Sequence, residues 1–384
     1  MPRLRRFLVP PLLAVLGVVP ATTATAASGA TGRPTASTAP VAGAPFTHVT
    51  WDSAADWRSG TLRGLQRKGE RLVVADSARV RNLQGRPHRV GSWTSRWQRS
   101  AVTELTPSWQ AYSGPAWVEV SVRTRSAGGR TGSWDTVAVW SVTGSGDRRT
   151  LRGQGDDVGR VEGGSWSVRE GARPQAAWQV RVEMSDRTRD SAISNLYRLD
   201  VATASGPYVP APTSAPGRAA GRPVAEDVPS YSVADTRAGQ RWATPAAFVM
   251  AMEGQGTQVS RGRGPIGYAA GRGYDNGTRA SDTFSFATAF LSTDGLTSSW
   301  VTRLADVTAL EEHLVRGRLV VVPLQAGARP VLVVGIEADG DVIVHDPSAP
   351  TRAAVPQVIP RADFEADWLS SGGLAGIVSD DITG

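Results

Sequence analysis

The sequence predicts two domains of different class, an all-β antiparallel sandwich over residues 45–204 and an α+β domain over residues 228–384. In the first region, apolar and polar residues alternate between glycine, serine and aspartate turns, with almost no helical periodicity. The second region combines helical patterns with short apolar strands. Residues 205–227 between them carry five prolines among glycines and alanines, which predicts an interdomain linker.

The sandwich prediction depends on several short strands. Residues 118–123 alternate valine with polar side chains, and residues 178–184 alternate Trp, Val, Val and Met with Gln, Arg and Glu. We also expect strands at 72–74, 136–142 and 196–201. Many short strands at this spacing are typical of an antiparallel sandwich.

Ten of the 13 tryptophans fall in this first region. Large aromatic side chains can fill a sandwich core, or they can be exposed as stacking platforms for sugars, and the sequence favours the core.

Residues 153–159 have the glycines and aspartates of a calcium loop but lack its ligand spacing and its closing glutamate, so we expect a turn. The four histidines are dispersed, and we predict no metal site and no cofactor.

A helix start is the clearest signal of the second region. Thr244 can cap free backbone N–H groups, Pro245 suits the first helical position, and an apolar run AAFVMAM follows. The N-terminal end of such a helix carries partial positive charge. We predict a surface loop at residues 254–277, because this segment is rich in glycine and arginine. Further helices are predicted at 281–290 and 310–315, and strands at 228–233, 300–304, 319–324, 330–336 and 341–344.

The N-terminus has the pattern of a secretory signal peptide over residues 1–26, with the basic segment MPRLRR, an apolar stretch and a small-residue cleavage site. A membrane anchor is the alternative, but the apolar run is too short to span a bilayer comfortably, and no stable membrane span is predicted. Residues 27–44 predict a flexible leader. We therefore expect a secreted protein, with attachment to the cell wall as a further option.

The formal net charge is +7, and the basic excess falls before residue 231 while the remainder is acidic. A basic surface favours anionic envelope polymers, although it also serves simply to keep a protein soluble. No base-reading motif accompanies the charge, so nucleic acid is not an expected partner.

Two stretches around the helix start match a known pattern. VPSYSV at residues 228–233 and WATPA at residues 242–246 resemble the "VPxYSQ" and "WCSPTS" segments of the secreted C39-like peptidases of actinobacteria. The segments WDSAAD, GSWTS and ELTPSW in the first region are similar to recurring parts of that family's N-terminal domain. The resemblance implies a papain-like α+β fold for residues 228–384 and a cysteine, histidine and acidic residue for peptide hydrolysis.

The resemblance places four functional positions on this chain. The family's cysteine falls on Ala243, its oxyanion-hole glutamine on Val233, its histidine on Arg329 and its acidic partner on Asp346. The chain contains no cysteine, and arginine stays protonated at neutral pH, so neither nucleophile nor base is present. Only Asp346, the orienting acid, is retained.

The residues that could replace the missing nucleophile and base are poor candidates. His345 precedes Asp346 and should point to the opposite face of its strand, which disfavours it as a displaced base. Ser232 and Thr244 carry hydroxyls, but a hydroxyl without a positioned base is inert.

The sequence therefore predicts an exported, catalytically inactive relative of C39-like peptidases that binds a peptide in the remnant cleft, a cell-wall polymer through the sandwich, or both. Two alternatives are an active hydrolase of peptide or amide bonds with a non-standard site, and a glycan-binding module that uses the second domain as a scaffold. Fold-level resemblance does not select a ligand, and the oligomeric state is open.

Overall fold

The computed structural model describes residues 46–380, except for residues 84, 113–116, 143–147, 155–157, 188–193, 207–212, 223–224, 226, 260–263 and 294–296. The predicted signal peptide (1–26) and leader (27–44) lie outside the described residues. Across the part of the chain that is described, no helix is both long and apolar enough to cross a membrane.

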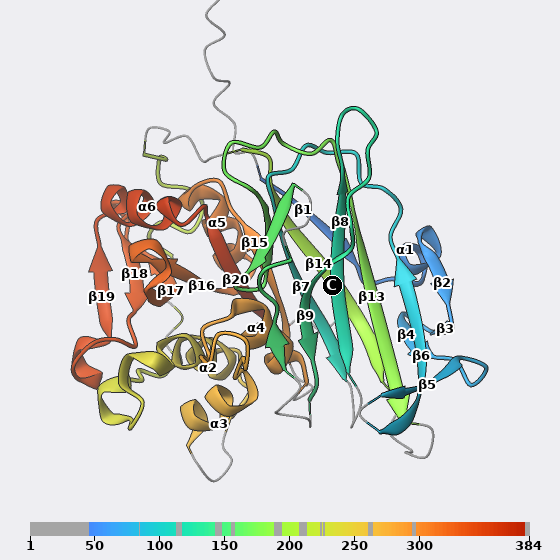
Figure 1. Cartoon of the computed structure of the whole chain (residues 1–384). Coiled ribbons are helices and arrows are strands. Elements are labelled where there is room, and N and C mark those ends of the chain that lie inside the picture. The colour runs from blue at the N-terminus through green and yellow to red at the C-terminus, as the bar shows by residue number, and fades with distance from the viewer. Residues whose placement is uncertain are drawn as a thin grey trace, which may run out of the picture. The chain divides into compact units, whose positions relative to one another are not determined.

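Two antiparallel sheets, each with seven described strands, form the predicted sandwich (Figure 1). The first sheet has the order β11-β12-β7-β14-β4-β3, with β1 paired to β14. Its strands are β1 (Phe46–Trp51), β3 (Leu65–Lys68), β4 (Arg71–Val74), β7 (Glu104–Tyr112), β11 (Gly159–Glu162), β12 (Ser165–Val168) and β14 (Asn195–Ala204). The β-sandwich prediction is confirmed.

The second sheet has the order β10-β9-β8-β13-β6-β2, with β5 paired to β6. Its strands are β2 (Thr61–Arg63), β5 (Arg79–Leu83), β6 (Arg86–Thr94), β8 (Val118–Arg125), β9 (Asp135–Trp140), β10 (Arg149–Thr150) and β13 (Ala177–Arg187). A short helix, α1 (Ala54–Ser59), follows β1.

Tryptophan fills much of the space between these sheets. Trp93 of β6 contacts Trp51 and Trp57 in edge-on geometry, with ring centroids 5.5 and 5.3 Å apart. The alternating residues behave as their period requires, because the valines of β8 and the apolar residues of β13 are fully buried. The expectation that tryptophan builds the core is confirmed for the seven buried ones: Trp51, Trp57, Trp93, Trp109, Trp140, Trp166 and Trp178.

The C-terminal part contains a six-stranded antiparallel sheet of order β15-β20-β16-β17-β18-β19. Its strands are β15 (Ser298–Arg303), β16 (Leu319–Leu324), β17 (Arg329–Ile336), β18 (Val342–His345), β19 (Pro356–Ile359) and β20 (Leu374–Ser379). Its helices are α2 (Ala243–Gly254), α3 (Pro265–Arg272), α4 (Phe284–Thr293), α5 (Val307–Val315) and α6 (Arg361–Ser370).

Helices cover both faces of this sheet. One set of strand residues, including Val321 and Leu332, shares a core with α2 and α4, whereas their sequence neighbours Val320 and Val333 share a core with α5 and α6. Strands buried on both faces read as continuous apolar runs, as β16 does. The arrangement is of the predicted α+β class, and its papain-like character stays a prediction.

Two sequence-based assignments differ from the structure. Residues 228–232 form no strand, and a 3₁₀ turn follows at Val233–Asp235. Pro229 has no N–H to donate, and the N–H of Tyr231 goes to the sulfur of Met250 instead of a neighbouring strand. The expected surface loop at 254–277 contains α3, because Pro265 fixes a helical φ at its first position.

The core continues from the sandwich into the C-terminal part. Phe286 of α4 lies against Trp109 and Trp140, with ring centroids 6.0 and 5.3 Å away. The Ser285 hydroxyl donates to the carbonyl of Pro107 at 2.6 Å. The described residues belong to one compact unit, and the boundary at residue 228 stays a prediction about how the chain folds.

The described part of the predicted linker is held against the C-terminal part by a buried ion pair. Arg361 and Glu311 pair at 2.8 Å, and both side chains are almost fully buried. Glu311 accepts the backbone N–H groups of Gly217 and Ala219, and Arg361 donates to the carbonyl of Ser214. This portion of the linker is therefore fixed, because the buried charges use its backbone as their hydrogen-bond partner.

Candidate functional site

Helix α2 begins at Ala243, to which the sequence resemblance assigned the family's cysteine. Trp242 is the residue before the helix, and it makes no side-chain capping bond. Thr244 is buried inside the first turn, so the predicted capping role of its hydroxyl is wrong. Ala243 is only 2% exposed, and every residue from there to Met252 is buried. The helix starts at the predicted place in the chain, and the side chain of Ala243 is a methyl group, which cannot act as a nucleophile.

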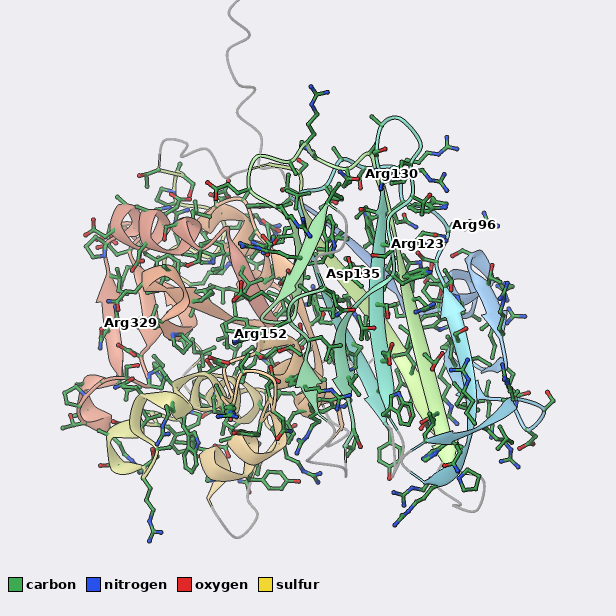
Figure 2. The ribbon with its side chains drawn as sticks, in the orientation of Figure 1. Arg96, Arg123, Arg130, Asp135, Arg152 and Arg329 are labelled. Atoms are coloured by element: carbon green, nitrogen blue, oxygen red, sulfur yellow. The ribbon has the colours of Figure 1, made fainter. Side chains whose placement is uncertain are left out.

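Arg329, to which the sequence resemblance assigned the family's histidine, is bound to Asp346. Its Nε and Nη2 atoms both lie 2.8 Å from Oδ2 of Asp346, and Nη2 also donates to Oε1 of Gln357 at 2.9 Å. The Asp346 side chain is 5% exposed, and its Oδ1 accepts the N–H of Ser348. The carboxylate that would orient an imidazole is therefore fully engaged by a guanidinium and a backbone N–H (Figure 2 labels Arg329).

The segment before α2 is attached to the loop that follows Asp346. Val233 donates its N–H to the carbonyl of Pro347 at 2.8 Å, and Gln240 donates through its side chain to the carbonyl of Ser348 at 3.2 Å. Helix α2 also packs against β17, the strand that Arg329 opens. The four predicted positions thus lie on adjoining elements. Val233 is fully buried and apolar, so its side chain offers no hydrogen bond to an oxyanion.

The substitute residues considered from the sequence are occupied elsewhere. Nδ1 of His345 lies 3.2 Å from the carbonyl oxygen of Pro229, and burial lowers the pKa of this histidine. The Ser232 hydroxyl donates to the carbonyl of Ala349 and accepts the N–H of Ala234. Among the described residues, no histidine ring is hydrogen-bonded to a serine or threonine hydroxyl. The pairing that activates a hydroxyl nucleophile is thus not found in that part of the chain.

A cavity of about 520 Å³ lies beside the start of α2. Trp242, Tyr231 and Ile266 supply apolar walls, and Arg352 lies at the same cavity. The Tyr231 hydroxyl donates to Glu253 at 2.6 Å, and burial together with this carboxylate raises the pKa of Tyr231 to about 12. An apolar pocket with a few polar groups at its edge suits one side chain of a peptide.

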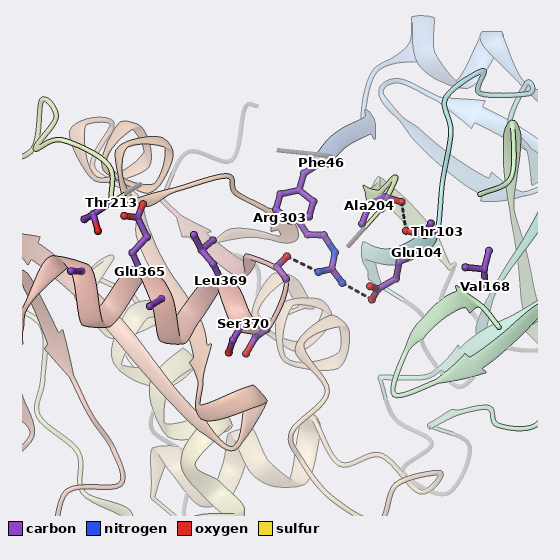
Figure 3. A pocket seen from close by; sticks show the side chains of 15 residues that line it. Phe46, Thr103, Glu104, Val168, Ala204, Thr213, Arg303, Glu365, Leu369 and Ser370 are labelled. Carbon is purple, nitrogen blue, oxygen red and sulfur yellow. Dashed lines mark hydrogen bonds and ion pairs between the residues drawn. The ribbon is translucent and has the colours of Figure 1, made fainter. Parts of the chain in front are cut away.

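A larger cavity, of about 780 Å³, lies between the sandwich and α6 (Figure 3). Arg303 is ion-paired with Glu104 and donates to the carbonyl of Gly372. Glu365 accepts the backbone N–H groups of Val307 and Ser214. The charged groups that line this cavity are thus already ion-paired or hydrogen-bonded within the protein.

Residues 47–204 match the family model described as the Peptidase C39 N-terminal domain. This match supports a relationship to C39-like peptidases, and it covers the strands of the sandwich from β1 to β14. No curated protein matches the chain.

Among solved structures, one match comes from work on the promiscuous specificity of the carbohydrate-binding modules from the beta-sandwich super family. It is 12% identical, with a TM-score of 0.19, over 41% of this chain and 55% of that chain. The chain thus spans about half the length of that protein, and at so low a score no shared fold follows.

Gln357 was not predicted from the sequence, and its Oε1 accepts a hydrogen bond from Nη2 of Arg329, the nitrogen that also contacts Asp346. Gln357 lies on β19, and Arg329 reaches it across β18 in the sheet order. No local pattern marks such a residue, because its role follows from strand order alone.

Proposed function

We propose that this chain is a non-catalytic relative of the C39-like peptidases that binds a peptide without cleaving it. The observation that carries this proposal is the ion pair between Arg329 and Asp346. A hydrolase of this type needs a thiol, an imidazole base and an acid that orients the imidazole. Here the acid is engaged by a permanent cation, and the helix start carries Ala243.

The cavity beside α2 supports peptide as the ligand. Its walls include the rings of Trp242 and Tyr231, and charged side chains stand at Asp235, Arg237 and Arg352. An apolar peptide side chain would fill the cavity, while flanking polar groups of the peptide would face these charges. Binding of this kind requires no nucleophile.

Two measurements on the purified mature chain test the proposal. First, we expect the chain not to hydrolyse denatured casein. Second, on an array of random peptides, we expect the chain to be retained by peptides that carry one large apolar side chain. Trp242→Ala should abolish this retention, whereas Tyr274→Ala, at an exposed aromatic residue outside the cavity, should leave it unchanged. Hydrolysis by the wild type that persists in Asp346→Ala would establish the rival function, an active hydrolase with a non-standard site.

We also propose that the chain is exported, on the strength of the N-terminal pattern at residues 1–26. Expression of the full-length chain should yield a culture-medium form that begins shortly after residue 26. Retention of an intact N-terminus in the cell pellet would contradict export.

A second candidate function is binding of an acidic cell-wall polymer by the sandwich. It is favoured by arginine side chains that gather on the outer face of the second sheet and have no carboxylate within ion-pair distance among the described residues.

A further inference from the structure

Five side chains form a contiguous cluster on the second sheet of the sandwich, and we call it the Arg–Trp cluster. Its members are Trp97, Arg123, Arg125, Trp134 and Arg181. The guanidinium carbon of Arg125 lies 3.9 Å from the ring centroid of Trp97. Arg123 and Arg181 lie 4.4 and 4.5 Å from the centroid of Trp134, and Arg123 is also 5.2 Å from Trp97. These distances are within the range of cation–π contacts.

The cluster lies on the outer face of the sandwich. Arg123 and Arg125 alternate along β8 with Val122 and Thr124, which are buried. On β13, Arg181 alternates in the same way with Val180 and Val182. Side chains of a strand point alternately to the two faces, so the arginines face away from the tryptophan core.

The register of the sheet brings the cationic residues together. Arg123 is paired with Gln179, and Arg181 is paired with Ser121 on one side and Thr94 on the other. Residues two apart on a strand are about 6.6 Å apart, and neighbouring strands are about 4.8 Å apart. Arg123 and Arg125 are therefore neighbours along β8, and Arg181 lies diagonally across from Arg123 on β13, where both contact the ring of Trp134.

The positive charge of the cluster has no carboxylate partner within ion-pair distance among the described residues. The hydrogen bonds of Arg123 go to Oε1 of Gln179, at 2.9 and 2.6 Å, and Nε of Arg125 donates to the Thr131 hydroxyl. These acceptors are neutral. Burial lowers the pKa of Arg123, and the nearby charges of Arg125 and Arg181 lower it further. The charges of Arg125 and Arg181 thus disfavour the charged form of Arg123, and a bound anion would relieve that repulsion.

More arginine surrounds the cluster at one end. Arg96 and Arg130 are exposed, and Figure 2 labels them near Arg123. Arg96 lies beyond the end of β6, and Arg130 lies in the turn that follows β8. The carboxylates of this face lie on the other side of Arg181: Glu183 is two residues from Arg181 on β13, where it is ion-paired with Arg81, and Glu119 lies opposite Glu183 on β8. An anion would therefore be drawn toward the end that carries the cluster.

The indole rings fix the guanidinium groups before any ligand binds. An arginine side chain in water samples many rotamers, and its ordering on binding costs free energy. Contact with Trp97 and Trp134 restrains Arg125, Arg123 and Arg181, and Gln179 adds a hydrogen bond to Arg123. The cluster is accordingly preorganised, with the remaining N–H groups of half-buried side chains available to an acceptor.

We propose that the Arg–Trp cluster binds a linear acidic polysaccharide through its carboxylate groups. A planar carboxylate accepts two parallel hydrogen bonds from a guanidinium fork, and a chain with repeated carboxylates can engage several guanidinium groups at once. The partly exposed hydroxyls of Ser92 and Thr94 on β6 border the cluster and can bind sugar hydroxyls. This site is separate from the Arg329–Asp346 pair, so it stands whether or not the C-terminal part binds peptide.

Affinity electrophoresis of the mature full-length chain tests this site directly. The probe is polygalacturonate, a linear carboxylated polysaccharide, cast into a native gel at low salt, with neutral dextran in a parallel gel. We expect polygalacturonate to retard the wild-type chain and dextran to leave its mobility unchanged. Binding measured by titration should be lost near 1 M salt, where the Debye length is about 3 Å.

Two variants distinguish the cluster from general surface charge. The triple variant Arg123→Gln, Arg125→Gln, Arg181→Gln should raise the dissociation constant about tenfold or more, equivalent to losing at least one strong ionic contact. The control removes the same charge from exposed arginines elsewhere in the sandwich, by Arg67→Gln, Arg86→Gln and Arg160→Gln. Its dissociation constant should stay within about twofold of the wild type, because scattered surface charges contribute little.

A further variant, Arg123→Lys, Arg125→Lys, Arg181→Lys, keeps the positive charge but lacks the planar guanidinium fork. This variant replaces the glutamine variant in the test if the glutamine variant does not fold. We expect its affinity to fall between those of the wild type and the glutamine triple. Three results would overturn the proposal: wild-type mobility unchanged by polygalacturonate, equal retardation by dextran, or affinity equal to wild type in either cluster variant. Binding of inorganic polyphosphate without binding of polygalacturonate would also overturn it, since the ligand would then be a phosphate polymer.

Discussion

The guanidinium of Arg329 contacts a single oxygen of Asp346 through two nitrogen atoms, each at 2.8 Å. Asp346 is the better buried partner, with its side chain 5% exposed against 23% for Arg329. The pair therefore has an asymmetric effect on stability. Loss of the arginine leaves a buried carboxylate without its counter-charge, whereas loss of the aspartate leaves a cation with access to water.

Arg329→Met should destabilise the fold by about 3 kcal/mol, because removing one partner of a buried ion pair leaves the other charge uncompensated. Asp346→Ala should cost less. Urea unfolding of both variants measures the difference, with Arg237→Met at an exposed arginine as a control that should stay within about 0.5 kcal/mol of the wild type. A larger loss for Asp346→Ala than for Arg329→Met would contradict this assignment.

Restoring the family's chemistry requires two changes. Ala243→Cys places a thiol in the first turn of α2, but Arg329 cannot donate a proton to a leaving amine, so we expect no turnover. Ala243→Cys with Arg329→His should give weak peptide hydrolysis, measured with a fluorogenic peptide, provided that Asp346 orients the new imidazole. The same pair with Asp346→Ala is the control, and equal activity there would rule out this geometry.

Val233→Gln is not expected to improve that double variant. Val233 is fully buried against Ala246 and Ile266, so a glutamine amide would enter an apolar site. An unpaired buried amide costs about 1–3 kcal/mol. We expect a lower urea midpoint without a gain in turnover.

The sequence predicted the helices and strands whose formation depends on the pattern of nearby residues. Alternating valines marked β8 because one side of that strand is buried, and the apolar run after Pro245 marked α2. It did not predict the Arg–Trp cluster or the contact of Arg329 with Gln357, because both depend on which strands lie side by side. Long-range register is set by the whole core, and no short window of residues contains it.

The contact between Phe286 and Trp109 bears on the predicted two-domain organisation. Phe286 is fully buried between residues of both parts, so Phe286→Ala should cost about 3–5 kcal/mol. Since the core is shared, we expect one cooperative urea transition, detected equally by tryptophan fluorescence and by circular dichroism. Two separate transitions, of which only one shifts, would instead favour independent folding of residues 45–204 and 228–384.

Glu311 should control how firmly the linker is held. Glu311→Ala removes the acceptor of Gly217 and Ala219 and leaves Arg361 buried without its counter-charge, at a cost of about 3–5 kcal/mol. Limited proteolysis should then cut residues 213–222 faster than in the wild type. Glu312→Ala, which removes only an exposed ion pair to Arg218, is the matched control, and equal cutting in both variants would contradict the role of Glu311.

His313 of α5 gives the fold a pH dependence of defined sign. Burial, together with the nearby charges of Arg318 and Arg316, lowers its pKa from 6.5 to about 4. The unfolded chain therefore binds a proton at higher pH than the folded chain does, so stability falls as pH decreases from about 6.5 toward 4. The upper limit of the slope is about 1.4 kcal/mol per pH unit from this one group. His313→Gln should flatten that part of the profile in urea unfolding, while His88→Gln serves as the control, and an unchanged slope in His313→Gln would show that other groups cause the acid sensitivity.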